Sequence, residues 1–158
     1  GSLSPQVPFA PMSAETQAKS LEIVFEPAPA QNPYLNMCYR SGNLYFLSGH
    51  VSTLKGKLGA DVTVEQGYAA AREVAVKLLQ SLRQAAGSLD SVRVVKLLGC
   101  VNGTPDFIEQ HLVINGASDL FHEIFGKDGD GYHARSAVGF ASLPTGVAVE
   151  IEAIFEAK

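Results

Sequence analysis

The segment from Thr63 to Ala86 most restricts the fold, because it is the longest amphipathic helix that the sequence predicts. Thr63 and Gln66 have the spacing of a capping box, and Gly87 is the kind of residue at which such a helix ends. Apolar residues recur at steps of three and four, which gathers them on one face. Small residues near its start would let this helix lie close against a sheet. They are Ala69, Ala70, Ala71 and Ala75.

Strand-like runs lie on both sides of this helix. The run MCYRSGNLYFLSGHVS, residues 37–52, contains two β-rich stretches separated by Ser41-Gly42-Asn43, which is typical of a hairpin with positive φ at Gly or Asn. After the helix, residues 91–101 form a β-branched run that is apolar on both faces. Such a run predicts a strand in the interior of a sheet.

The second half of the chain predicts another helix and two more strands. The helix is expected at about residues 117–125, stopped by Gly126. The strands are expected at 136–141 and 147–155, on either side of the Pro-Gly turn SLPTG. The resulting order is β-β-α-β-α-β-β. It predicts an α+β domain in which one mixed sheet carries two helices on one face.

The other face of this sheet is then uncovered. Alternate residues of the last strand point to opposite faces, so the outward set mixes glutamates with an isoleucine. The other strands are apolar on both sides, and an uncovered, partly apolar sheet usually binds a partner. We therefore expect a homo-oligomer. The outward set of the last strand is Glu150, Glu152, Ile154 and Glu156.

Charge and hydropathy restrict the partners of the chain. The 12 basic and 16 acidic residues give a net charge of −4, and no three Lys or Arg residues are consecutive. This makes nucleic acid an unlikely partner, since phosphates require a clustered basic face. No stretch offers the ~20 apolar residues of a membrane span. No secretory signal is visible and the two cysteines fit no metal motif, so a cytoplasmic location is expected.

Residues 1–33 are expected to form an N-terminal extension to a single domain at residues 34–158. Six of the eight prolines lie between Leu3 and Pro33, and each proline biases the residue before it away from helix. A short helix is nevertheless expected at residues 14–23. Gly1-Ser2 is typical of the remnant of a cleaved purification tag.

Common catalytic and metal-binding motifs are absent from the sequence. The run DGDG at residues 128–131 lacks the spacing of an EF-hand, which favours a solvated turn over a calcium site. The four histidines form no metal-binding pair, so no metal and no cofactor are expected. His50 and His133 are more often loop or cap residues than acid–base groups, although the pKa range of histidine permits that role.

Arg135 and Glu150 are the candidates for a functional site. Arg135 enters a strand from a glycine-rich loop, which suits bidentate recognition of a carboxylate. The alternative is a structural ion pair, with Glu150 itself as a candidate partner. Whether the two side chains share a face depends on the register across SLPTG, because a slip of one residue turns every side chain to the other face.

The stretch ARSAVGFASLPTGVAVEIEAIFEA, residues 134–157, resembles the C-terminal signature of the RidA/YjgF family of reactive-intermediate deaminases, also labelled endoribonuclease L-PSP-like. That signature is close to A-R-S-x-V-x-x-A-x-L-P followed by [VI]-E-I-E-A-I. LYFLSGHVS resembles the second strand of the family, with its S-G-[QH] ending, and NPYLNM is similar to its G-P-Y segment. The resemblance covers about residues 32–157. It implies a chorismate-mutase-like fold and a homotrimer with sites in the clefts between subunits.

The resemblance also implies roles for individual residues. Arg135 matches the arginine that binds the substrate carboxylate, and Glu150 matches the glutamate that positions the hydrolytic water. Gly49 matches a glycine whose carbonyl group faces the ligand, and Tyr34 matches a tyrosine that lines the cleft.

Two further matches depart from the family pattern. Ala137 stands where many members have a cysteine, whose contribution is largely a backbone N–H. A ligand-side asparagine of the family falls on Asp119 without a gap, or on Asn115 with one. An acidic group beside a substrate carboxylate would oppose binding, so Asp119 points to a substrate that differs from the typical one.

The activity that the resemblance implies is hydrolysis of 2-imino or 2-aminoacrylate-type acids to 2-oxo acids and ammonia, as in 2-iminobutanoate/2-iminopropanoate deaminases. A protonated imine is already electrophilic, so one carboxylate clamp and one oriented water suffice without a triad or a metal. One alternative is a non-catalytic protein that binds a 2-oxo acid in the arginine cleft. Another is an endoribonuclease, an activity reported within the family that the negative net charge disfavours.

Overall fold

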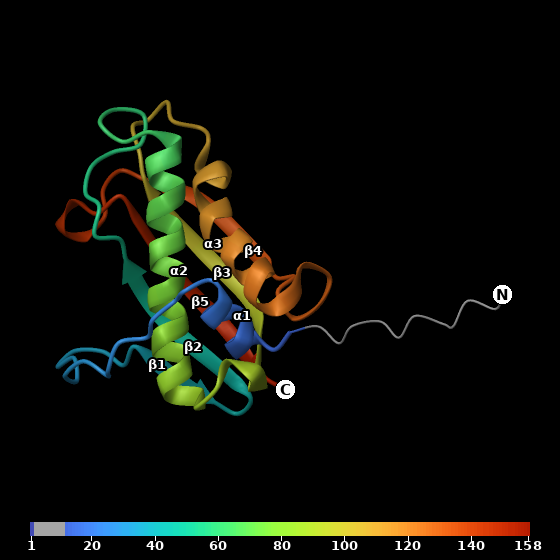
Figure 1. The fold of residues 1–158 in the computed structure, drawn as a ribbon. Coiled ribbons are helices and arrows are strands. Elements are labelled where there is room, and N and C mark those ends of the chain that lie inside the picture. Colours follow the sequence, from blue (N-terminus) through green and yellow to red (C-terminus); the bar gives the residue numbers. More distant parts are fainter. Residues whose placement is uncertain (2–11) are drawn as a thin grey trace.

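The structure, a computed structural model, describes residue 1 and residues 12–158. In this part of the chain two long helices cover one face of a five-stranded sheet, and a short helix packs beside them (Figure 1). The helices are α1 (Ala14–Ser20), α2 (Val64–Ala86) and α3 (Gln110–Phe125). The strands are β1 (Cys38–Ser41), β2 (Leu44–Val51), β3 (Val92–Asn102), β4 (Ala134–Phe140) and β5 (Val149–Ala157).

The sheet has the strand order β1-β2-β5-β3-β4 and is mixed. β3 and β4 run parallel, whereas the other neighbouring strands run antiparallel. The parallel pair is connected by α3, as a parallel crossover requires. The predicted α+β class and the order β-β-α-β-α-β-β are therefore confirmed.

Helix α2 forms as its sequence predicts. The Thr63 hydroxyl accepts a hydrogen bond from the Gln66 backbone N–H at 3.1 Å, and the Gln66 side chain accepts one from the Thr63 N–H at 2.9 Å. Gly87 ends the helix with a φ of +85°, and its N–H donates to the Arg83 carbonyl. These bonds satisfy backbone groups that a helix end leaves free. The buried face packs on the sheet, with Ala71, Val74, Ala75, Leu78, Leu79 and Leu82 fully enclosed.

Helix α3 begins at Gln110, so the prediction of a start near Ala117 was wrong. The helix has no local start signal at its true beginning, because its N-cap Glu109 makes no side-chain capping hydrogen bond, and Gly116 within it is a poor helix former. Gly116 is instead the point at which α3 touches α2. A Cβ atom at this position would lie against the Tyr68 carbonyl oxygen and 3.2 Å from the Arg72 nitrogen. The glycine thus permits contact between two helix backbones.

The last two strands do not form a hairpin, which corrects the expectation that SLPTG joins neighbouring strands. β3 lies between β4 and β5 and pairs with both. The turn at Pro144–Gly146 carries the chain past the end of β3, with a φ of +57° at Thr145 and +77° at Gly146. β3 is rich in β-branched and other apolar residues, although Arg93 and Lys96 are exposed, and it takes the interior position that this run predicts.

The other predictions on local structure differ only in detail. β1 and β2 form the expected hairpin, in which Gly42 has a φ of +58° and Asn43 keeps a negative one. Within residues 12–33, α1 is shorter than the expected 14–23. The Glu15 carboxylate on α1 accepts hydrogen bonds from Arg83 Nε at 3.0 Å and from the Leu89 N–H at 2.9 Å. Residues 2–11 lie outside the described residues, and a domain boundary at residue 33 stays a prediction.

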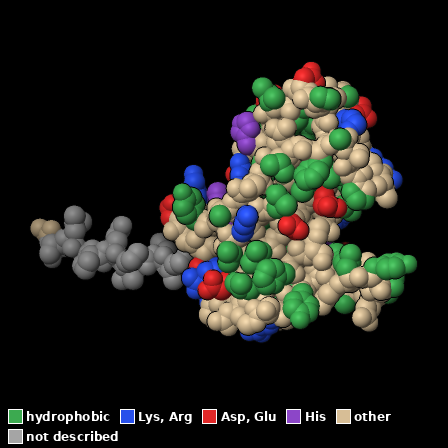
Figure 2. All heavy atoms as spheres, turned by 180° about the vertical axis from the view of Figure 1, so that it is seen from behind, with side chains coloured by type: hydrophobic (Ala, Val, Ile, Leu, Met, Phe, Trp, Pro, Cys, Tyr) green, Lys and Arg blue, Asp and Glu red, His purple; other side chains and the backbone are tan. Residues whose placement is uncertain are grey.

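The face of the sheet opposite the helices is open (Figure 2). Large apolar side chains lie partly exposed on it, among acidic and basic ones, as the sequence predicted for a single subunit. Among the helices that the structure describes, none has both the length and the apolar character needed to cross a bilayer. The exposed apolar side chains on the sheet are Tyr39, Phe46, Val138 and Phe140.

The contact at Gly116 leads to a stability prediction. We expect Gly116→Ala to lower the free energy of unfolding by about 3 kcal/mol, since the added methyl group meets backbone rather than a movable side chain. Gly67→Ala is the matched control, because its Cβ would meet only the side-chain ends of Leu58 and Val113. We expect it to cost about 1 kcal/mol or less, since both changes gain helix propensity. Urea unfolding of both variants at the same protein concentration measures the two free energies of unfolding. Equal losses in Gly116→Ala and Gly67→Ala would contradict the close contact between the helix backbones.

Candidate functional site

Arg135 lies at the edge of the sheet, beneath α3. In the parallel pairing it stands opposite Leu97, which is completely buried under the helices. Residues directly opposite each other share a face, so the Arg135 side chain points to the helix-covered face. Its Nη1 donates a hydrogen bond to Ser118 Oγ at 3.1 Å, and its Nη2 lies 3.5 Å from the His111 carbonyl oxygen. The guanidinium is half-buried.

The guanidinium of Arg135 keeps N–H groups available for a ligand. A guanidinium has five donors in a fixed plane, and the protein occupies two of them here. Burial lowers the pKa of the Arg135 guanidinium, whereas the negative charge of Asp119 acts in the opposite direction. Because the pKa of arginine starts so high, the group remains a cation. This arrangement can bind a carboxylate through two parallel hydrogen bonds.

Glu150 lies on the open face, opposite Cys100 of β3 and Val51 of β2. Cys100 belongs to a small apolar cluster with Leu143 and Val147 of the β4–β5 connection. Burial raises the pKa of the Glu150 carboxyl above its ordinary value, and the nearby negative charge of Glu152 raises it further. A carboxylate with a raised pKa is a stronger base than an ordinary glutamate.

Gly49 lies directly beside Glu150. A Cβ atom on Gly49 would lie 3.0 Å from the Glu150 carboxyl carbon and 3.1 Å from its Oε2. The missing side chain therefore leaves the space that the carboxyl group occupies. The structure thus brings together two of the residues that the resemblance indicated.

A β-bulge produces this contact. The pairing of β2 with β5 shifts register between Leu47 and His50, and Gly49 lies within the shift. The His50 ring is buried between β2 and α2, with Nδ1 2.6 Å from the Ser48 carbonyl oxygen and Nε2 2.7 Å from Ser81 Oγ. His50 therefore fixes the bulge. The glycine inside a strand pattern is the sequence signal that could have predicted it.

Arg135 and Glu150 lie on opposite faces of the sheet within one chain. β3 shows this directly, because Arg135 pairs with Leu97 whereas Glu150 pairs with Cys100, three residues further along. The four ion pairs among the described residues involve neither side chain. The alternative of an ion pair between them inside one subunit is therefore wrong. A single site that uses both residues needs a second subunit.

The remaining predicted residues are distributed around these two. Ala137 follows Arg135 by two positions on β4 and shares its face. Asp119 lies on the exposed side of α3, where its carboxylate accepts a hydrogen bond from the Tyr68 hydroxyl at 2.5 Å. Asn115 lies one turn earlier and is half-buried. Tyr34 is 94% exposed in the loop before β1.

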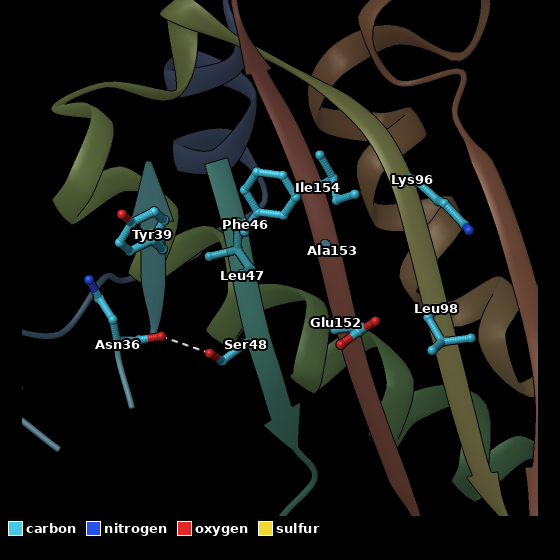
Figure 3. Close-up of a pocket in the computed structure, with 10 residues that line it drawn as sticks. All are labelled: Asn36, Tyr39, Phe46, Leu47, Ser48, Lys96, Leu98, Glu152, Ala153 and Ile154. Carbon is cyan, nitrogen blue, oxygen red and sulfur yellow. Dashed lines mark hydrogen bonds between the residues drawn. The ribbon is translucent and has the colours of Figure 1, made fainter. Parts of the chain in front are cut away.

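A groove of about 450 Å³ runs along the open face across β1, β2, β5 and β3 (Figure 3). Phe46 and Ile154 lie at one end of it, and Glu152 lies toward the other end, near Leu98. The Ser48 hydroxyl at its margin donates to the Asn36 carbonyl oxygen at 2.7 Å. The lining of the groove combines apolar side chains with polar ones and with two opposite charges, those of Glu152 and Lys96. No three His, Cys, Asp or Glu side chains of residues 12–158 are placed to hold a metal ion.

Comparison with known proteins gives a consistent result. A family model described as "YjgF/chorismate mutase-like, putative endoribonuclease" matches residues 27–149. Protein TCP17 of Trypanosoma cruzi is 42% identical over 152 residues, which cover 92% of this chain and 93% of that protein.

Solved structures show the same relationship. A protein of unknown function from Agrobacterium tumefaciens is 40% identical with a TM-score of 0.82, and 92% of each chain is covered. A "putative endoribonuclease" from Shewanella oneidensis MR-1 is 27% identical with a TM-score of 0.84, covering 92% of this chain and 99% of that one. The YjgF gene product of E. coli is 28% identical with a TM-score of 0.57, covering 85% and 96%.

The surroundings of Glu150 lead to a titration prediction. We expect the pKa of Glu150 to lie above its ordinary value, and Glu152→Gln to lower it, because that change removes a negative charge which disfavours ionisation. Glu156→Gln is the control, since Glu156 lies farther along the same face of β5 and should leave the pKa of Glu150 unchanged. Carboxyl carbon resonances followed by NMR during a pH titration give each pKa. An unchanged Glu150 pKa in Glu152→Gln would contradict the charge coupling.

Proposed function

The chain belongs to the YjgF/chorismate mutase-like family, and on that premise we propose that it hydrolyses 2-imino acids and their enamine tautomers to 2-oxo acids and ammonia at a site between subunits. The observation that supports this most strongly is the arrangement of two side chains, one suited to binding a carboxylate and one suited to carrying a proton. The Arg135 guanidinium is held with free N–H groups, and the Glu150 carboxyl lies in the space beside Gly49 with a raised pKa.

Arg135 is the proposed anchor for the substrate carboxylate. A 2-imino acid carries its carboxylate on the carbon next to the C=N bond, so one bidentate contact fixes both the position and the orientation of the reacting carbon. The Ala137 backbone lies on the same strand and face, and it is the proposed source of a further contact. The Asp119 carboxylate accepts a hydrogen bond from the Tyr68 hydroxyl, and its negative charge favours the cationic form of Arg135.

Glu150 is the proposed proton carrier. It removes a proton from water as the water oxygen bonds to the carbon of the protonated imine and the C=N electron pair moves to nitrogen, which gives a neutral carbinolamine. It then returns this proton to the amino nitrogen of the carbinolamine. The C–N bond breaks with its electron pair leaving on ammonia, and the hydroxyl proton passes to the Glu150 carboxylate as the C=O bond of the 2-oxo acid forms; Glu150 then releases that proton to ammonia or to water. A carboxyl with a raised pKa suits both steps.

The site requires two subunits, and we propose that these belong to a homotrimer. Arg135 and Glu150 face opposite sides of one sheet, so an Arg135 side chain meets a Glu150 side chain only when another copy covers the open face. The partly exposed apolar side chains on that face support such an interface. Tyr34, almost fully exposed in one subunit, is proposed to line the cleft of a neighbouring one.

The endoribonuclease description belongs to the relatives, and this chain offers little support for RNA binding. Its net charge is −4, and Glu150, Glu152 and Glu156 lie on its open face. The second candidate is a protein that binds a 2-oxo acid without turnover. The environment of Arg135 suits a deaminase and a binding protein equally, because each must bind a carboxylate. A change at Glu150 distinguishes them, since only the deaminase needs its carboxyl group.

The decisive assay measures ammonia and pyruvate release from 2-aminoacrylate formed in situ by a serine lyase. We expect the wild type to accelerate release, and Arg135→Ala to lose this acceleration because the substrate is no longer anchored. Glu150→Gln should lower kcat at least about 100-fold while pyruvate binding persists, since a neutral amide cannot carry the proton. Pyruvate binding without turnover by the wild type would support the binding protein, and neither binding nor turnover would refute the proposed site.

Mixed oligomers test the division of the site between subunits. Arg135→Ala and Glu150→Gln subunits, each inactive alone, are unfolded together in equal amounts and refolded. If one subunit supplies Arg135 and its neighbour supplies Glu150, about a quarter of the sites regain both native groups. We therefore expect about a quarter of the wild-type activity. No activity in the mixture would show that one subunit supplies both groups.

A further inference from the structure

Two residues that the sequence comparison did not indicate, Ser118 and His133, lie beside Arg135. Ser118 Oγ is 2.9 Å from Nε2 of His133 and 3.1 Å from Nη1 of Arg135. His133 Nδ1 is 2.6 Å from the Gly131 carbonyl oxygen. The three side chains come from α3, from the loop before β4 and from β4. Ser118 is only 6% exposed, whereas His133 and Arg135 are half-buried.

The chemistry of the end groups determines the direction of the two outer bonds in this chain. The Gly131 carbonyl can only accept, so His133 Nδ1 carries a proton and donates it. The Arg135 guanidinium can only donate, so Ser118 Oγ accepts from it through a lone pair. The Ser118 hydroxyl proton is then free to point to Nε2 of His133, which must be unprotonated to accept it. Of the two neutral forms of His133, only the Nδ1–H form lets the ring accept this proton.

We propose that Ser118 and His133 are positioning residues that fix the Arg135 guanidinium in the orientation in which its free N–H groups bind a carboxylate. The inference rests on the proposed function, because it concerns the same anchor. Ser118 acts directly on Arg135, and His133 acts through Ser118. Neither residue needs to touch the substrate.

The surroundings of His133 favour the neutral ring that the chain requires. The edge of its ring meets Phe121, with centroids 6.0 Å apart, and the His122 ring lies 5.5 Å away. Burial lowers the pKa of His133, and so do the charges of His122 and Arg135, although the hydrogen bond to Gly131 acts in the opposite direction. A protonated ring would donate from both nitrogens and would leave the Ser118 hydroxyl without its acceptor.

The first test observes the wild-type protein directly. Long-range nitrogen–proton NMR distinguishes the two neutral forms of a histidine ring. We expect His133 in the Nδ1–H form, and the same form for His50, whose Nδ1 also lies near a carbonyl oxygen. His133→Gln removes one of the two signals and so assigns them. A proton on Nε2 of His133 would overturn the proposal whatever the variants show.

The second test measures the binding of pyruvate by calorimetry. We expect Ser118→Ala and His133→Ala each to weaken binding roughly tenfold, since an orienting hydrogen bond is lost. In the deaminase assay the same changes should raise KM more than they lower kcat. His133→Gln is the conservative variant, because the Gln side-chain oxygen can accept from the Ser118 hydroxyl, and it should bind nearly as the wild type does.

A double-mutant cycle separates positioning from a general effect on folding. In the Arg135→Lys background a positive charge still attracts pyruvate but there is no planar guanidinium to orient, so Ser118→Ala should not weaken pyruvate binding further. A merely structural role would weaken it again. Circular dichroism and the unfolding midpoint show whether each variant is folded, and the NMR measurement needs no variant that risks misfolding.

The outcomes also separate this inference from the proposed function. If Arg135→Ala loses pyruvate binding while Ser118→Ala and His133→Ala bind as the wild type, the positioning role is wrong and the carboxylate anchor stands. If Arg135→Ala binds pyruvate as the wild type does, or the wild type binds none, the anchor fails and the positioning role fails with it.

Discussion

Strand β3 pairs with β5 on one side and with β4 on the other, and this double pairing determines where the candidate residues point. The register places Arg135 opposite Leu97 and Glu150 opposite Cys100. Since neighbouring β residues alternate between faces, the arginine meets the helices and the glutamate meets the open side. A site that uses both residues would therefore have to include another copy of the chain.

Sequence motifs predicted those parts of the fold in which the interacting residues are close together in the sequence. The capping box at Thr63, the stop at Gly87 and the hairpin at Gly42 each depend on residues within a few positions, and all three form. The start of α3 and the order of β4 and β5 depend on distant partners. Gly116 looks like a helix breaker until α2 lies against it, and SLPTG looks like a hairpin until β3 is inserted.

The sequence likewise predicted some residues of the candidate site but not the contacts between distant parts of the chain. The resemblance of the C-terminal stretch identified Arg135 and Glu150, and the structure adds the contact of Glu150 with Gly49 through a bulge. The sequence could not predict the faces, because the register was unknown. Nor could it predict Ser118 as a partner of Arg135, because the two meet only through the packing of α3 on β4. The spacing of these two residues in the sequence does not indicate that they are in contact.

An oligomer that covers the open face would change the chemistry of Glu150 as well as its neighbours. In a single subunit this carboxyl is already partly enclosed, and its pKa is raised by burial and by Glu152. Removal of more water lowers the local dielectric constant, which strengthens both effects and the attraction to a cationic imine, whereas the guanidinium of a neighbouring copy would lower the pKa of Glu150. Assembly would then supply the arginine, exclude water and tune the proton carrier in one step. In the proposed function, a chain whose sequence has neither a triad nor a metal-binding motif would therefore carry out hydrolysis at the boundary between two copies.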